Sequence, residues 1–153
     1  MHKFYGILLG VFMLFTSPTS ATERFTTERF TTELNITVTN IDTSRGGNIV
    51  VMIFGEEGFP KNHALALLTA TKKVLSNTMV FTFLINQPEV AIKVLHDENG
   101  DGEVTKNWTG IYPKDGLGFF NDQKIGLTGP PNYLKSKIRF VAPKSEATIS
   151  IIY

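Results

Sequence analysis

The chain has 153 residues, of which 42% are hydrophobic, and its formal net charge is +1. A chain of this length can bury one core, so a single domain is expected. The near-neutral charge, without a dense lysine and arginine cluster, excludes the electrostatic footprint of a nucleic-acid-binding protein. The chain contains no cysteine, which excludes disulfides, cysteine nucleophiles and thiolate metal sites.

Residues 1–21 differ in composition from the rest of the chain. A short basic start at His2 and Lys3 precedes an apolar run, Phe4 to Phe15, and small residues up to Ala21. This order predicts a secretory signal peptide cleaved after Ala21, and therefore a periplasmic or secreted mature protein. The apolar run is shorter than the roughly 20 residues that span a bilayer. No transmembrane segment is expected in the mature chain, and an uncleaved anchor is the alternative.

Residues 22–33 read TERFTTERFTTE, a five-residue unit given twice and begun a third time. One phenylalanine per unit supplies too little apolar surface for this segment to pack by itself. We interpret it as a mobile leader. The alternative is an amphipathic adhesive segment, but the spacing of Phe25 and Phe30 fits neither helical nor strand periodicity.

The first expected strands follow the leader. Apolar and polar residues alternate from Leu34 to Thr39, which is typical of a half-buried strand. The run Ile49 to Phe54 is continuously apolar, as in a strand buried on both faces. The paired glycines between these strands predict a turn, so the two strands are expected to form a hairpin. The next segment, Ala64 to Leu75, suits a helix or a strand, and we favour a strand with one helical turn near its start.

Four more segments have the composition of strands, and they complete the expected fold. They are residues 79–85, 89–95, 136–142 and 147–153. About seven short strands with little helix predict an all-β domain over residues 34–153, a single antiparallel β-sandwich. The connection from His96 to Lys135 has 40 residues and no strong periodicity. Its aromatic and glycine content predicts one long ordered loop with a function.

The second half of the chain resembles a known bacterial family. The motifs that carry the resemblance are AIKVLHDENGDGEVTKNWTGIYPKDGLGFFND, at residues 91–122, and GPPNY, at residues 129–133. They are similar to those of the exported domain of unknown function 2141, over roughly residues 34–153. Tyr112 interrupts the family's Gly-Ile-Pro motif, and Phe120 replaces a serine. The resemblance implies an exported sandwich of immunoglobulin-like or transthyretin-like type and no known activity.

The stretch DENGDG suggests a Ca²⁺ site. Asp97, Asn99 and Asp101 stand at alternate positions before a glycine, as in the first half of a calcium-binding loop. Glu103 is expected to add its backbone carbonyl and Thr105 a water-mediated contact. The bidentate glutamate of such loops is missing, because Trp108 takes its place. The further candidates for that carboxylate are Asp115, Asp122 and Glu98.

A plain turn is the alternative interpretation of DENGDG, because Asn-Gly and Asp-Gly are strong turn formers. An enzyme of hydrolase type that uses the loop carboxylates is a further alternative. His96 and Asp97 are adjacent on a strand and point to opposite faces, however, and the sequence contains no catalytic motif. We therefore expect no catalytic residue and no enzymatic activity. His63 lies in a polar loop and is expected to have no role.

Aromatic residues of the long connection are candidates for ligand binding. Trp108, Tyr112 and Phe119, with Asn121, have the composition of a platform for a sugar or a peptide. The alternative, which we favour, is that the aromatic rings fold inward and cap the sandwich. The sequence thus predicts an exported binding or envelope module with an unknown partner, such as a glycan or an envelope protein. A purely structural envelope protein without a metal is the remaining alternative.

Overall fold

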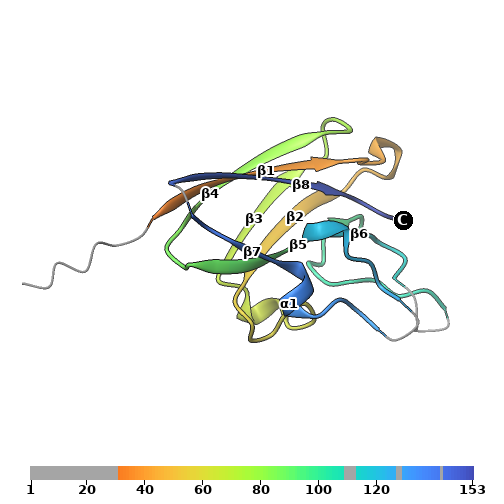
Figure 1. Ribbon diagram of the computed structural model, residues 1–153. Coiled ribbons are helices and arrows are strands. Elements are labelled where there is room, and N and C mark those ends of the chain that lie inside the picture. The colour runs from red at the N-terminus through yellow and green to blue at the C-terminus, as the bar shows by residue number, and fades with distance from the viewer. Residues whose placement is uncertain (1–30, 109–112, 127–128, 142) are drawn as a thin grey trace, which may run out of the picture.

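The computed structural model describes residues 31–108, 113–126, 129–141 and 143–153 (Figure 1). The expected signal peptide, most of the leader and Tyr112 lie outside these residues. Within them, eight strands form a three-stranded and a five-stranded sheet, with one short α-helix. The prediction of a β-sandwich is therefore confirmed. None of the helices in the described ranges is long and apolar enough to span a membrane.

The three-stranded sheet has β1 (Thr32–Thr39) at its centre. β1 pairs antiparallel with β4 (Met79–Ile85) and parallel with β8 (Lys144–Ser150). One strand pair of the sandwich is therefore parallel, where an antiparallel arrangement was expected throughout. Burial alternates along β1, as predicted from its sequence. The strand starts at Thr32, so the last two residues assigned to the leader belong to the sheet.

The five-stranded sheet has β2 (Asn48–Phe54) and β5 (Glu89–Asp97) at its centre. β3 (Leu68–Lys73) pairs with the outer edge of β2. The other edge of β5 is shared by two short strands. β7 (Lys137–Arg139) pairs with the start of β5, and β6 (Gly116–Phe119) pairs with its end. All these pairs are antiparallel.

The expected hairpin between the first two strands is wrong, because β1 and β2 lie in different sheets. The chain crosses between the sheets through a short 3-10 helix, η1 (Thr43–Arg45). Asp42 caps this helix by accepting a hydrogen bond from the backbone N–H of Ser44 at 3.0 Å. The segment Ala64 to Leu75 does begin with a helical turn, η2 (His63–Leu65), and continues as β3. That prediction is confirmed.

Two apolar clusters explain why β2 and β5 are buried on both faces. The main core lies between the sheets and includes Ile36 from β1 and Ile92 from β5. A second cluster lies on the outer face of the five-stranded sheet. Its buried residues are Val50, Met52, Phe54, Leu95, Leu117 and Phe119. The loop at residues 55–67 and the connection at residues 96–135 cover this outer face, so the long connection has a small core of its own.

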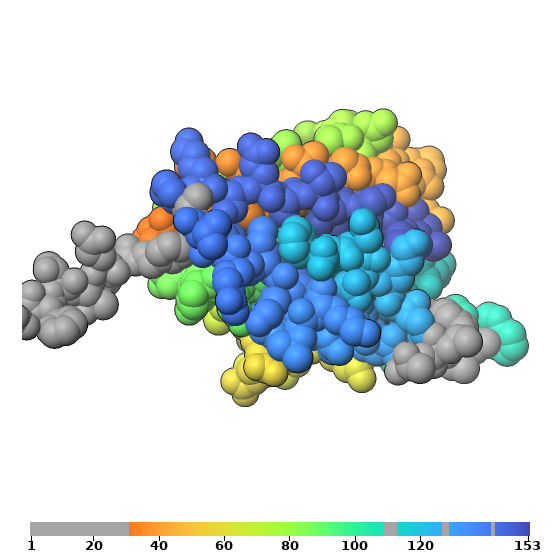
Figure 2. Space-filling model, viewed as in Figure 1, coloured from red at the N-terminus to blue at the C-terminus, as the bar shows by residue number. Residues whose placement is uncertain are grey.

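The long connection is more structured than expected. It contains β6, a 3-10 helix η3 (Phe120–Asp122) and the helix α1 (Tyr133–Ser136). The chain from β6 onward covers much of the face seen in Figure 2, in cyan to dark blue. The glycines of β6 point toward β8, since a Cβ at Gly118 would lie 2.6 Å from the Ile149 side chain. Leu117 and Phe119 point the other way and belong to the second cluster.

Candidate functional site

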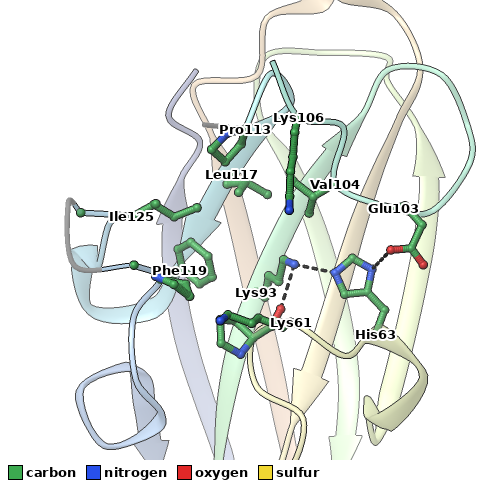
Figure 3. A pocket seen from close by; sticks show the side chains of 14 residues that line it. Lys61, His63, Lys93, Glu103, Val104, Lys106, Pro113, Leu117, Phe119 and Ile125 are labelled. Atoms are coloured by element: carbon green, nitrogen blue, oxygen red, sulfur yellow. Dashed lines mark hydrogen bonds and ion pairs between the residues drawn. The ribbon is translucent and has the colours of Figure 1, made fainter. Parts of the chain in front are cut away.

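A cavity of about 490 Å³ opens on the outer face of the five-stranded sheet, between the 55–67 loop and the long connection (Figure 3). β5 contributes Lys93, and β6 contributes Leu117 and Phe119. The 55–67 loop and the long connection form the remaining walls. They contribute His63 from η2 and Glu103 from the residues after DENGDG. The volume lies in the range of small-molecule pockets. We call this cavity the Lys93 pocket.

Lys93 is the most unusual residue of the pocket, because it is a lysine side chain that is only 3% exposed. Residues alternate in direction along β5, so Lys93 shares the outer face with Leu95. Its Nζ donates to the carbonyl oxygen of Pro60 at 2.9 Å and to Nε2 of His63 at 2.5 Å. None of the ion pairs in the described part of the chain involves Lys93. The ammonium group is therefore buried without a carboxylate partner.

Burial lowers the pKa of Lys93 to about 8, because desolvation disfavours the charged form, while the more distant Glu103 favours it slightly. An ordinary lysine has a pKa near 10.4. Lys93 thus holds a proton at neutral pH but gives it up more easily than a surface lysine. Perturbed lysines of this kind are found at functional sites more often than at random positions.

His63 holds Lys93 in place and is itself held at both ring nitrogens. Its Nδ1 lies 2.8 Å from the carbonyl oxygen of Gly102, which can only accept, so Nδ1 carries the proton. Nε2 is then the acceptor for the Lys93 ammonium. Burial lowers the pKa of His63, and the charge of Lys93 lowers it further. The expectation that His63 has no role is wrong, because the loop folds back onto β5.

The rest of the pocket combines apolar walls with further cations. The apolar side chains are Pro60, Val104, Pro113, Leu117, Phe119, Ile125 and Pro130. Lys61 and Lys106 also line it, and Figure 3 shows Lys106 extending into the cavity from the side opposite Lys61. The only acidic side chain among the described lining residues is Glu103, whose Oε2 lies 4.0 Å from Nδ1 of His63. The pocket is therefore apolar and electropositive.

The acidic loop beside the pocket is organised by its own hydrogen bonds. Asp97 is 2% exposed, and its two carboxylate oxygens accept from the backbone N–H of Gly100 at 2.8 Å and of Gly102 at 2.9 Å. Asp101 accepts from the Glu103 N–H at 2.8 Å and from the Asn99 side chain at 2.7 Å. These contacts form tight turns, and they present the Gly102 carbonyl to His63 and Glu103 to the pocket.

Two of the three carboxylates that could complete a metal site have other partners. Asp115 accepts a hydrogen bond from the Thr105 N–H at 2.7 Å, and Glu98 pairs with Arg45 at 2.7 Å. Burial raises the pKa of Asp115, and the nearby charges of Glu98 and Asp97 raise it further. Across the described ranges, no three histidine or acidic side chains are grouped closely enough to hold a metal ion. Ca²⁺ binding by the loop stays a prediction from the spacing of its residues.

A melting experiment tests the loop. Asp97→Ala is expected to lower the free energy of unfolding by about 2 kcal/mol even in EDTA, because two backbone N–H groups lose their acceptor. Bound Ca²⁺ would also raise the wild-type melting temperature by roughly 5 to 15 °C at saturating concentration. Mg²⁺ serves as the control, since it demands stricter octahedral geometry. Identical wild-type curves in EDTA, Ca²⁺ and Mg²⁺ would contradict the calcium hypothesis.

The four residues predicted to bind a ligand do not form one site among the described residues. Phe119 lines the Lys93 pocket. Trp108 is 97% exposed, so the interpretation that it caps the sandwich is wrong. Asn121 lies in η3 and donates to the carbonyl of Lys135 at 3.3 Å, away from the pocket lining. Tyr112 lies outside the described residues. Of the three predicted residues that the structure describes, it therefore brings Phe119 to the pocket.

His96 has a structural role and is not among the residues that line the pocket. It is fully buried, and its Nε2 lies 2.7 Å from the carbonyl oxygen of Gly46, to which it donates. The hydroxyl of Tyr153 accepts from the Asp42 N–H and donates to Nδ1 of His96 at 2.6 Å. Asp97 points to the opposite face of the sheet. These contacts tie the end of β5 to η1 and to Tyr153.

The sequence did contain one signal of the pocket. Lys93 interrupts the apolar run AIKVL in a strand that is otherwise suited to burial on both faces. A lysine at such a position must have a hydrogen-bonding partner or lie beside a cavity. The partner itself could not be read from the pattern, because His63 lies 30 residues earlier and in a different type of element.

Comparison with known proteins gives one match. The family model described as "Uncharacterized protein conserved in bacteria (DUF2141)" matches residues 36–149. No curated protein and no solved structure shows significant similarity to the chain. The matched range includes β5, the acidic loop and the whole connection that walls the Lys93 pocket.

Proposed function

Since the chain belongs to the bacterial DUF2141 family, whose description gives no activity, we propose its function from the Lys93 pocket itself. The protein is an exported binding module that holds a small organic anion with an apolar body. The acid group lies against Lys93, and the apolar part lies against Phe119 and Leu117. The proposed partner of this binding module is therefore a small molecule.

The observation that carries the proposal is the buried ammonium group of Lys93, which has no ion-pair partner among the described residues. Burial of an unpaired charge is costly, and a protein that keeps one gains when a ligand supplies the opposite charge. Two of the three ammonium hydrogens are used by Pro60 and His63. The third has no acceptor among the described residues, and we propose that it donates to the ligand oxygen.

The rest of the pocket favours a monoanion with a hydrophobic part. Lys61 and Lys106 add positive charge, whereas Glu103 at the His63 side disfavours a second negative charge nearby. The apolar side chains of β6 and Ile125 offer no hydrogen bonds, so a sugar with hydroxyls on every face would lose its hydration there. Alkyl and aromatic carboxylates have the required combination of charge and apolar surface.

A panel of alkyl carboxylates and benzoates, each with its neutral amide, tests this function by thermal melting. A matching carboxylate present at about 100 times its dissociation constant is expected to raise the melting temperature by roughly 5 to 15 °C. The amide should raise it little. Lys93→Met should lose the carboxylate-dependent rise, and the exposed β3 residue Lys73→Met is the matched control that keeps it. Equal shifts by acids and amides would contradict an anion site.

Export is the second part of the proposal, and it is supported by the basic start, apolar run and small residues of positions 1–21. Expression of the full chain in a bacterium is expected to give a periplasmic or secreted protein that begins near Thr22. Leu8→Arg, which interrupts the apolar run, should leave the chain uncleaved in the cytoplasm. Recovery of the wild type from the membrane fraction with Met1 intact would contradict cleavage.

A further inference from the structure

We propose that Lys93 binds carbonyl compounds covalently, as a reversible imine with an aldehyde or an α-keto acid held in the pocket. This inference rests on the proposed anion pocket: Lys61 and Lys106 hold the acid group of such a ligand, and its carbonyl carbon takes the place beside Lys93 that a simple carboxylate occupies. It goes further in assigning a reactive group to the site. The contacts of Lys93 and the chemistry of its neighbour His63 support this assignment.

The contacts of Lys93 leave one hydrogen of its ammonium group without an acceptor among the described residues. Lys93 is one of the residues that line the cavity, and the hydrogen bonds of its Nζ go to a carbonyl oxygen and to an imidazole nitrogen. No carboxylate pairs with it in the described ranges, so no direct ion pair fixes it in the ammonium form. A lysine in an apolar pocket with this environment is the usual form of an amine that reacts with carbonyl groups.

His63 is placed to accept the proton that Lys93 must lose. Its Nε2 lies 2.5 Å from Nζ, within direct proton-transfer distance. Nδ1 is fixed as a donor by the Gly102 carbonyl, and the carboxylate of Glu103 lies 4.0 Å from it. Burial disfavours an imidazolium at His63, whereas the Gly102 carbonyl and Glu103 favour it, and the opposing charge of Lys93 is gone once Lys93 has given up its proton. His63 acts on the reaction through Lys93 and through the departing water.

The chemical step is balanced without an oxidant or a reductant. Lys93 transfers a proton to Nε2 of His63, and the free amine adds its lone pair to the carbonyl carbon of the ligand. The carbonyl π electrons move to oxygen, which takes up a proton from the nitrogen to give a carbinolamine. His63 returns its proton to the hydroxyl group, which leaves as water while the nitrogen lone pair forms the C=N bond. One ammonium and one carbonyl thus become one protonated imine and one water.

Burial supports this role by increasing the share of free amine. Because burial lowers the pKa of Lys93 to about 8, its neutral form at pH 7.5 is roughly 200-fold more abundant than that of a surface lysine. The titratable and charged groups around it are His63, Glu103, Lys61 and Lys106. The surface lysines of the same molecule provide an internal comparison for the reactivity of Lys93.

The test uses para-carboxybenzaldehyde, which carries a carboxylate, an aromatic body and an aldehyde, with cyanoborohydride to reduce any imine. At pH 7.5 the folded wild-type protein is expected to gain the mass of one carboxybenzyl group, which peptide mapping assigns to Lys93. Excess para-hydroxymethylbenzoate, which has no carbonyl to attack, should protect Lys93 from labelling. His63→Ala should slow the labelling by about 10-fold or more, since it removes the proton acceptor.

The outcomes separate this inference from the binding function. Lys93→Arg, which keeps a cation but cannot form an imine, should bind para-hydroxymethylbenzoate without gaining mass at residue 93. If the wild type binds para-hydroxymethylbenzoate but the aldehyde labels lysines at random, the covalent step is overturned and the anion pocket stands. If neither compound binds and Lys93 is not labelled, both proposals fail together. Labelling of Lys93 that the competitor does not reduce also contradicts the inference.

Discussion

Raising the pH from 7.5 to 10.5 is expected to stabilise the wild-type domain relative to its Lys93→Met variant by about 3 kcal/mol. The reason is that burial lowers the pKa of Lys93 from 10.5 to about 8 in the folded protein. Between these two values the unfolded chain binds the proton and the folded chain does not, so stability rises with pH. Each pKa unit corresponds to about 1.4 kcal/mol.

The sign of this effect is opposite to that of a lysine in a salt bridge. The penalty for the buried ammonium group is fully present below pH 8 and is lost as the pH rises through the ordinary lysine value. Urea unfolding of both proteins at the two pH values measures the difference between their free energies of unfolding. The tyrosines are the same in both proteins, so the contribution of their titration cancels. A difference that stays constant over this pH range would show that Lys93 is as well solvated as a surface lysine.

Gly118→Val is expected to lower the free energy of unfolding by about 3 kcal/mol or more, because the site is already in close contact with β8. A Cβ at position 118 would lie 2.6 Å from the Ile149 side chain and 3.0 Å from the backbone oxygen of Ser150. The backbone oxygen belongs to a paired strand and cannot move freely. The two methyl groups of valine would force β6 away from β8.

This substitution should also damage the pocket, because β6 carries Leu117 and Phe119 on its other face. Gly126→Ala is the matched control, since a Cβ there meets no atom within 4 Å. Its stability is expected to stay within about 0.5 kcal/mol of the wild type. Urea denaturation followed by circular dichroism measures both variants. Equal midpoints for Gly118→Val and the wild type would contradict the close packing of β6 on β8.

Strand positions could be predicted from local patterns, but strand pairing could not. Alternation predicted β1, a continuous apolar run predicted β2, and apolar residues at every second position predicted most of β5, because burial on one or both faces determines which residues of a strand are apolar. Pairing depends on contacts between distant residues. β1 meets β8 from the far end of the chain, so a turn signal between β1 and β2 was no guide to their partners.

β6 was missed because its pattern differs from that of an ordinary strand. The segment GLGF has only four residues, and two are glycines, which are depleted in strands. The glycines are needed because β6 lies too close to β8 for inward side chains. Its outward Leu117 and Phe119 then form a pocket wall. Because the close approach of β6 to β8 requires glycines, the sequence predicted neither the strand β6 nor its contribution to the pocket wall.

The acidic loop illustrates how one motif supports two interpretations. Asp97 was expected as a metal ligand, and its carboxylate accepts hydrogen bonds from Gly100 and Gly102 in the manner of a turn. The same residue types serve both purposes, because short acidic side chains bind backbone N–H groups as readily as cations. The pocket depends on this loop in either case, since Gly102 orients His63.

Calorimetric titration at pH 8 tests most directly whether the Lys93 pocket binds an organic anion through its buried ammonium group. Para-ethylbenzoate and its neutral amide are titrated into the wild type and into Lys93→Met, in two buffers of different ionisation enthalpy. We expect the carboxylate to bind one site with uptake of protons, since a bound anion raises the pKa of Lys93. The amide and the variant should bind about 100-fold more weakly, as expected for loss of a charged hydrogen bond. Equal affinity for carboxylate and amide, or carboxylate binding that survives in Lys93→Met with unchanged proton uptake, would contradict this mode of binding.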